Sequence, residues 1–89
     1  MTLKLRDGVS SADTEYGIML LDEDSGQYWN LNPTAAQALR TLLSGSAPEQ
    51  AARELAERYQ VDAATADRDV RELLDDLRSA GLVEPEGMP

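Results

Sequence analysis

The chain contains no cysteine, no histidine and no phenylalanine, and its aromatic residues are three tyrosines and one tryptophan. Because cysteine is absent, a disulfide framework and a thiolate nucleophile are excluded. Because histidine is absent too, the commonest general base and the usual transition-metal ligands are missing. A Ser-His-Asp triad is impossible for the same reason. We therefore expect a protein that is not an enzyme, with no catalytic residue, no metal site and no cofactor.

Long hydrophobic runs are also missing. No run approaches the ~18 apolar residues that a membrane span needs. The first residues lack the long apolar stretch of a secretory signal. The six glycines are scattered over turns and helix ends rather than gathered in a phosphate-binding loop. We expect a cytoplasmic protein that does not contact a membrane.

Basic residues are few, and the net charge is −9. Residues 46–89 are the more acidic half, with eleven acidic and five basic side chains. Such a surface repels nucleic acid and anionic lipid. The length of 89 residues allows one domain at most. We expect that domain over residues 1–84 and a flexible C-terminal tail over 85–89.

The first third of the chain has the pattern of short strands. Apolar residues alternate at Leu3 and Leu5, and a nearly continuous apolar run covers residues 16–22. The small carboxylates before Gly26 are typical of a turn, and an aromatic stretch, QYWNL, follows over residues 27–31. The pattern predicts three strands, the second and third joined as a hairpin, with a loop or ragged edge over residues 7–15.

The remainder of the chain is helical in pattern. Asn32 followed by Pro33 fits the start of a helix that ends near Gly45. Ser46 and Glu49 have the spacing of a capping box for a second helix. A third helix is capped by Asp62 and ends near 81, and its buried stripe is expected at Ala66, Val70, Leu73, Leu77 and Ala80. Strands followed by helices predict an α+β fold with a three-stranded antiparallel sheet, then three helices, in a winged helix-turn-helix topology.

Three functions fit parts of this pattern. The carboxylates of residues 22–26 resemble the start of a calcium loop, but Gly26 comes one residue early and no closing glutamate follows. A carrier protein would be similarly acidic and helical, but its modified serine should open a helix, whereas Ser25 lies in the predicted turn. A winged-helix transcriptional regulator fits the topology, but the third helix carries twice as many acidic as basic residues, which opposes phosphate binding.

The aromatic strand at residues 27–31 suggests another use. As the last strand of a three-stranded sheet it is expected at an edge, and it has neither the lysine nor the proline that usually blocks an edge. An open aromatic edge is a candidate for the addition of a strand from another chain. By parity, Trp29 and Leu31 share one face, so they are either part of the core or part of a binding surface.

Three segments of the chain, YWNLNPTAAQALRTLLSG, ERYQVD and DVRELLDDLRSAGLVE, form an ordered set of motifs. Through them the chain resembles, over residues 3–84, the PqqD-like family, the recognition elements for precursors of ribosomally made and modified peptides. The shared positions are Leu31, Asn32, Gly45, Tyr59, Val61, Asp69, Val70, Leu74, Leu77, Gly81, Leu82 and Val83. Among these proteins it is most similar to the stand-alone members that serve lasso-peptide biosynthesis.

The resemblance implies that the chain binds the leader segment of a precursor peptide and presents it to processing enzymes, a transglutaminase-like leader peptidase and a cyclase. It also implies that the leader pairs with the third predicted strand and lies against the third helix. A helical wheel at ~100° per residue then selects the flank of that helix. The expected peptide-binding residues are Tyr28, Trp29, Asn30, Leu31, Asp67, Arg68, Arg71, Leu74, Asp75 and Arg78.

Overall fold

The structure is a computed structural model that describes residues 2–86. It contains the strands β1 (Thr2–Leu5), β2 (Val9–Thr14), β3 (Gly17–Asp22), β4 (Tyr28–Leu31) and β5 (Val83–Glu86), and the helices α1 (Pro33–Leu43), α2 (Pro48–Tyr59) and α3 (Ala63–Ser79). The expected α+β class, with a three-stranded antiparallel sheet and three helices, is confirmed. Among the described helices, none is both long enough and apolar enough to cross a membrane.

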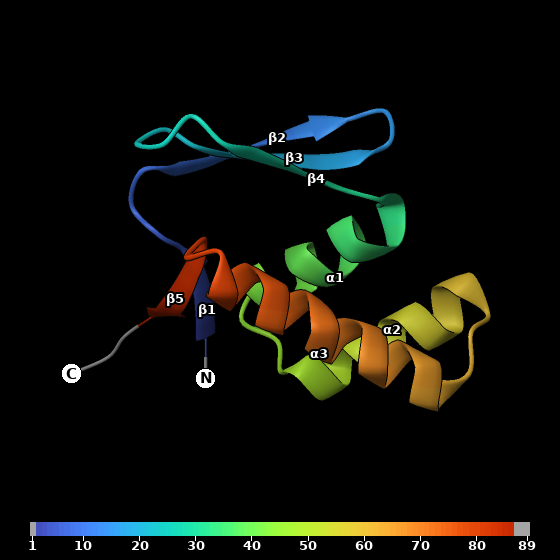
Figure 1. Ribbon diagram of the computed structural model, residues 1–89. Helices are drawn as coiled ribbons and strands as arrows, with labels where there is room; N and C mark the ends of the chain where they lie inside the picture. Colours follow the sequence, from blue (N-terminus) through green and yellow to red (C-terminus); the bar gives the residue numbers. More distant parts are fainter. Residues whose placement is uncertain (1, 87–89) are drawn as a thin grey trace.

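The strands form two separate sheets. The larger sheet is antiparallel with the order β2-β3-β4 and lies as a layer over the helices (Figure 1). We expected Leu3–Leu5 to belong to this sheet, and that expectation is wrong. For residues 7–15 we expected a loop or a ragged edge, and they contain β2, a regular strand at the edge of this sheet. The side chains of β2 are mostly exposed, so its sequence has no alternation of apolar and polar residues from which a strand could be predicted. Backbone pairing with β3 holds β2 in the sheet.

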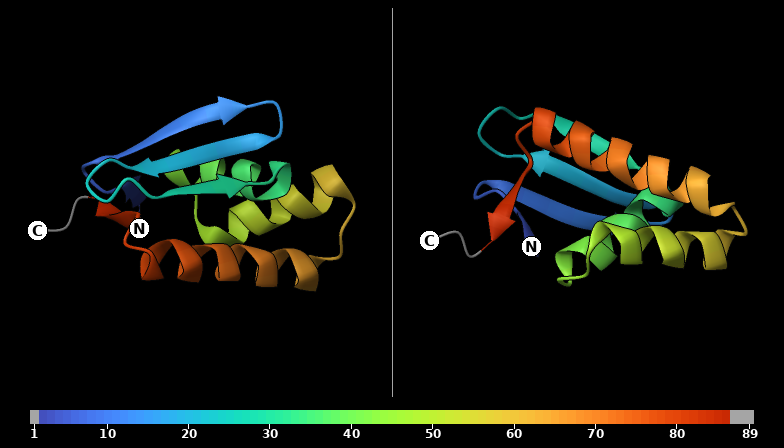
Figure 2. Two further views of the ribbon diagram at one scale, coloured as in Figure 1. Left: turned by 45° about the horizontal axis from the view of Figure 1, so that its top comes forward. Right: turned by 90° about the horizontal axis from the view of Figure 1, so that it is seen from below.

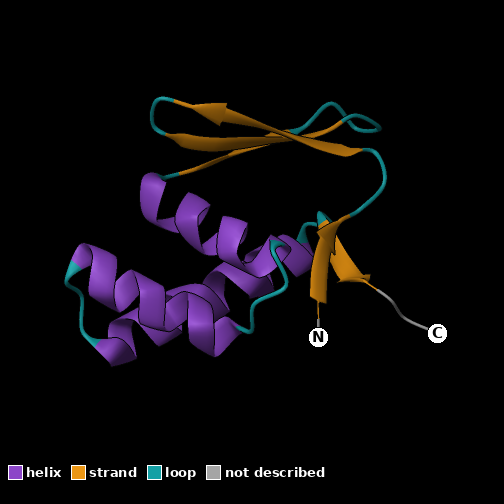
Figure 3. Cartoon of the chain, turned by 180° about the vertical axis from the view of Figure 1, so that it is seen from behind, coloured by secondary structure: helices purple, strands orange, loops and turns teal. Residues whose placement is uncertain are grey.

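The smaller sheet consists of β1 and β5 in antiparallel pairing (Figure 3). It brings the two ends of the described chain together beside the helices, with Leu5 opposite Val83. The strand β5 was not expected, and it runs into the segment for which we expected a flexible tail. Residues 85 and 86 of that segment pair with β1, and residues 87–89 lie outside the described part of the chain.

The expected hairpin between the second and third apolar segments is confirmed as β3–β4. In its turn, the carboxylate of Asp22 accepts a hydrogen bond from the backbone N–H of Asp24 at 3.0 Å. At the other end of β3, Gly17 has φ +144°, and an added Cβ would lie 1.9 Å from the carbonyl oxygen of Leu31. Glycine is therefore required for the end of β4 to approach the start of β3 this closely.

Two of the three expected helix starts are confirmed. Asn32 accepts a hydrogen bond from the N–H of Ala35 at 2.8 Å, and Asp62 accepts one from Thr65 at 2.7 Å. The capping box at Ser46 is wrong, because the N-cap of α2 is Ala47 and no side chain caps it. Pro48 explains the difference, since its fixed φ and missing N–H suit the first helical position and set the start there.

The core lies between the inner face of the larger sheet and the three helices. The helix α1 packs against β3 and β1, and α2 packs against both α1 and α3. The largest fully buried side chains are Leu20, Leu39, Leu55, Leu82 and Val70. One sheet face and the inner faces of the helices therefore share one core, and β4 is left at the rim of the sheet.

Candidate functional site

The strand β4 forms an edge of the larger sheet, as the sequence predicted. In the part of the chain that the structure describes, β4 pairs with β3 on one side and with no strand on the other. Trp29 and Leu31 are partly buried and pack against the core, whereas Tyr28 is 62% exposed and Asn30 is exposed. A row of backbone donors and acceptors on the free side of β4 is thus available to another strand.

A cleft separates this edge from α3. In the left view of Figure 2, β4 is the strand of the larger sheet nearest to α3. The cleft has a volume of about 490 Å³. It is lined by Asn30, Leu31, Asn32, Thr34, Ala35, Ala38, Leu55, Val61, Asp69, Glu72, Leu73 and Asp76.

The lining of this cleft divides by chemistry. Apolar side chains from all three helices and the α2–α3 loop contribute Ala35, Ala38, Leu55, Val61 and Leu73. The wall formed by α3 is acidic, because three of the four α3 residues that line the cleft are carboxylates. The β4 wall contributes backbone groups and neutral side chains. An extended peptide with apolar side chains on one face fits such a cleft better than a nucleic acid does.

A second hollow lies at the start of β4. It has a volume of about 490 Å³ and is lined by Gly26, Gln27, Tyr28 and Trp29. The two hollows involve consecutive residues of the chain, from Gly26 in the β3–β4 turn to Leu31 at the end of β4. All four strand residues that we expected at the site, Tyr28 to Leu31, therefore line one hollow or the other.

The α3 residues expected at the site, unlike those of β4, do not line the β4–α3 cleft. Of the described residues that line the cleft, none is Asp67, Arg68, Arg71, Leu74, Asp75 or Arg78. Asp67 instead lines a hollow between α2 and α3, and it pairs with Arg71 at 3.0 Å. The helical wheel located the buried stripe correctly at Ala66, Val70, Leu73 and Leu77, but the flank chosen from it is not the one that lines the β4–α3 cleft.

Leu74 requires a separate correction. The sequence left two roles open for it: a peptide-binding side chain between arginines on the exposed side of α3, or a residue that widens the core stripe. It is 6% exposed and belongs to the core, which is the second of these roles. The residues that sequence reasoning missed are Asp69, Glu72 and Asp76. A signal for them was present, because they fall at i, i+3 and i+7 on the flank of the stripe opposite Arg71.

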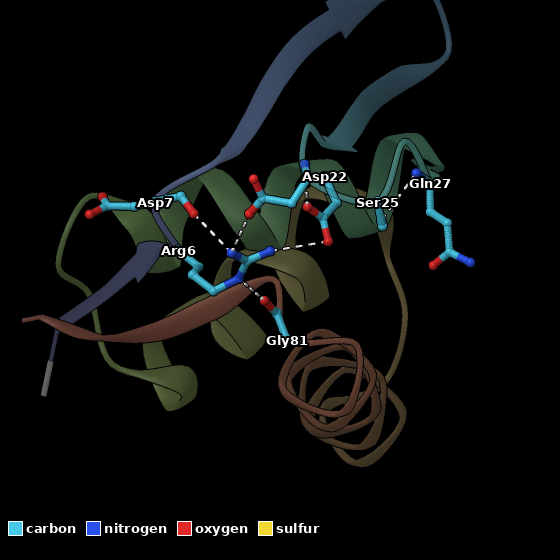
Figure 4. Close-up of polar contacts among 7 residues, drawn as sticks. Arg6, Asp7, Asp22, Ser25, Gln27 and Gly81 are labelled. Atoms are coloured by element: carbon cyan, nitrogen blue, oxygen red, sulfur yellow. Dashed lines mark hydrogen bonds and ion pairs between the residues drawn. The ribbon is translucent and has the colours of Figure 1, made fainter.

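Arg6 connects the β3–β4 turn to the end of α3 (Figure 4). Its guanidinium lies 3.1 Å from the carboxylate of Asp22 and 3.4 Å from that of Asp24, and it donates from Nε to the carbonyl oxygen of Gly81 at 2.6 Å. Desolvation favours the neutral guanidine, but the hydrogen bonds to Asp22 and Asp24 outweigh it and raise the pKa of Arg6. Arg6 thus holds the hairpin that carries β4 against the chain that leaves α3.

Known proteins share the sequence pattern and the fold of this chain. Residues 17–83 match the family model described as coenzyme PQQ synthesis protein D, PqqD. The match covers the larger part of the chain. The chain belongs to the PqqD family. No curated protein sequence matches it.

Two solved structures are similar to this PqqD-family chain over almost its whole length. One is described as lasso peptide synthetase B1 complexed with the leader peptide; it is 40% identical, with a TM-score of 0.88, and the alignment covers 96% of this chain and 100% of that one. The other is TbiB1 in complex with the TbiA(beta) leader peptide; it is 30% identical, with a TM-score of 0.77, and the alignment covers 97% of this chain and 98% of that one. The transcriptional regulator that we kept as an alternative finds no support in these matches.

Proposed function

We propose that this chain binds the leader segment of a ribosomally synthesised precursor peptide, in the biosynthesis of a lasso peptide. The observation that carries the proposal is an open edge strand beside a cleft, in a chain 40% identical to a protein solved with its leader peptide. The leader adds to β4 as a further strand of the larger sheet. One part of the bound leader lies over the hollow at Tyr28 and Trp29, and the adjoining part lies in the β4–α3 cleft.

Strand addition divides affinity and specificity between two parts of the leader. The leader backbone pairs with the free N–H and C=O groups of β4, which gives affinity that depends little on leader sequence. Alternate leader side chains point toward the helices, because side chains of a strand alternate between its faces. Those side chains meet Trp29, Leu31 and the apolar floor of the cleft, and they supply the specificity.

The chain acts as a non-catalytic adaptor in this proposal. It presents the bound leader to the processing enzymes, a transglutaminase-like leader peptidase and a cyclase, in the cytoplasm. The lack of histidine and cysteine in the sequence supports a binding role over a catalytic one. We further propose that the arrangement of sheet and helices is a winged-helix topology used for a peptide, since α3 has more acidic than basic residues and suits DNA poorly.

The α3 side of the proposed site differs from the one inferred by sequence. The β4 residues Tyr28 to Leu31 are retained, and the helix contributes the flank that lines the cleft. The flank at Arg71 lies on the α2 side of α3, where Asp67 borders a hollow with α2. The proposal therefore locates the leader on one side of α3 only.

The test is a titration of the chain with a fluorescently labelled leader of the precursor encoded beside its gene, followed by hydrogen exchange. We expect saturable binding, and protection of the β4 amides and the leader amides that face them. Binding without protection at β4 would contradict strand addition, whereas no binding would contradict the function itself. Duplex DNA serves as the control ligand and should not bind at physiological salt, because the chain has a net charge of −9.

A further inference from the structure

The acidic wall of the β4–α3 cleft has a consequence for the ligand. Asp69, Glu72 and Asp76 all line the cleft from α3. Among the described residues, Glu72 and Asp76 take part in no ion pair, and Asp69 has a single distant partner, Arg68 at 3.9 Å. A carboxylate that is already paired with a basic neighbour would attract a basic side chain of a bound peptide only weakly. Here at least two carboxylates remain available to a cation that enters the cleft.

We propose that the leader carries a lysine or arginine two residues away from a bulky apolar side chain, on the face that enters this cleft. The apolar side chain occupies the floor at Leu55, Val61 and Leu73, and the cation lies against Glu72 and Asp76. This inference rests on the proposed function and deepens it, because it names the chemistry of the bound segment.

The spacing follows from the geometry of the two elements. Side chains on one face of a strand recur every second residue, about 6.7 Å apart. Along α3, the positions of Glu72 and Asp76 differ by four residues, or about 6 Å at 1.5 Å per residue. Leu73 lies between them in sequence and lines the same cleft. Because leader side chains that enter the cleft recur every second residue, one can occupy the apolar floor while the next on that face reaches the carboxylates on either side of Leu73.

The cleft also makes this contact more selective than a contact on an open surface. The bound leader itself covers the cleft and excludes water from the space between β4 and α3, and a lower local dielectric strengthens the ion pair. An acidic leader side chain at the same position would be repelled by the same carboxylates. The carboxylates of α3 thus favour a leader with a basic side chain at this position and disfavour a peptide with an acidic one.

The experiment selects peptides from a display library of random 14-residue sequences on the immobilised full chain. We expect the selected peptides to be enriched in lysine or arginine two residues from a bulky apolar residue. The same selection on the Glu72→Gln/Asp76→Asn variant should lose the cation and keep the apolar residue. The matched control is Asp7→Asn/Glu57→Gln, which removes one aspartate and one glutamate charge at exposed positions outside the cleft and should keep the enrichment.

A selected peptide is then titrated against each variant by fluorescence anisotropy. The Glu72→Gln/Asp76→Asn variant should bind about tenfold more weakly at low salt, or ~1.4 kcal/mol, and the difference should shrink as salt rises. Replacing the peptide's cation by glutamine should lower its affinity for the wild-type chain but not for this variant. Selected peptides that contain apolar anchors without the cation would overturn the inference and leave the proposed function intact. A library from which no peptide is selected would instead count against the proposed function.

Discussion

Arg6 donates a hydrogen bond from Nε to the carbonyl oxygen of Gly81 at 2.6 Å, although the two residues are 75 positions apart in the sequence. The same guanidinium pairs with carboxylates in the β3–β4 turn, so one side chain joins the hairpin that carries the open edge to the end of α3. The width of the β4–α3 cleft depends on how the hairpin and the helix are held relative to each other. Arg6 is therefore expected to influence both stability and leader binding.

Replacing Arg6 by lysine should lower the melting temperature and weaken leader binding. A single ammonium group cannot reproduce the planar fork that contacts two carboxylates and a carbonyl oxygen at once. Thermal melts by circular dichroism and a titration with labelled leader measure the two effects. Arg53→Lys, at an exposed position on α2, is the control and should behave as wild type. An Arg6→Lys variant that melts at the wild-type temperature would show that these contacts contribute little.

The stability of the fold should decrease in acid. Hydrogen bonds from Thr65 lower the pKa of Asp62 below its usual 3.8. Desolvation raises the pKa of Asp22, but hydrogen bonds from Asp24, Ser25 and Arg6 outweigh it, so that pKa is lowered as well. Folding thus favours the ionised carboxylates. They stabilise the fold fully at pH values above the usual pKa of the unfolded chain, and this stabilisation is lost as the pH falls through the lowered pKa of the folded chain.

Urea unfolding at neutral pH and at pH of about 2 measures this loss. The Asp62→Asn variant keeps an oxygen that can cap α3 but cannot titrate. We expect it to lose less stability than wild type between the two pH values. An equal loss in both proteins would assign the acid sensitivity to other groups.

Truncating Trp29 should weaken leader binding strongly. Buried aromatic anchors typically cost about 2 kcal/mol or more when they are cut back to alanine, or roughly 30-fold in affinity. Trp29 also packs against the core, so circular dichroism must show that Trp29→Ala remains folded. Trp29→Phe keeps an aromatic ring and should retain most of the affinity. Normal leader binding by a folded Trp29→Ala protein would mean that the peptide lies elsewhere.

Two substitutions on neighbouring positions of α3 distinguish its two flanks. Glu72 lines the cleft with β4, whereas Arg71 pairs with Asp67, which borders the hollow with α2. Glu72→Lys should therefore change leader affinity more than Arg71→Glu does, when both are titrated at low salt. The opposite order would restore the flank that the helical wheel selected and would place the leader on the α2 side of α3.

Local sequence determined the parts of this protein that depend on neighbouring residues. The caps at Asn32 and Asp62, the β3–β4 turn and the buried stripe of α3 were predicted correctly, because each follows from hydrogen bonds or periodicity within a few residues. The edge position of β4 was also predicted, since the last strand of a three-stranded meander lies at one side. The PqqD resemblance, read from an ordered set of such local features, was confirmed.

Tertiary structure decided what depends on the packing of distant segments. The strands β2 and β5 are formed by pairing with β3 and β1, and their own residues show little strand pattern. The wheel of α3 gives the direction of the core but not which flank faces β4, because that depends on where the sheet and α2 lie around the helix axis. Packing placed α2 beside Asp67 and left Glu72 and Asp76 facing the cleft. The periodicity of α3 depends on residues of α3 alone and does not say on which side of the helix β4 lies. For that reason only the folded chain could show that the wall of the cleft is acidic.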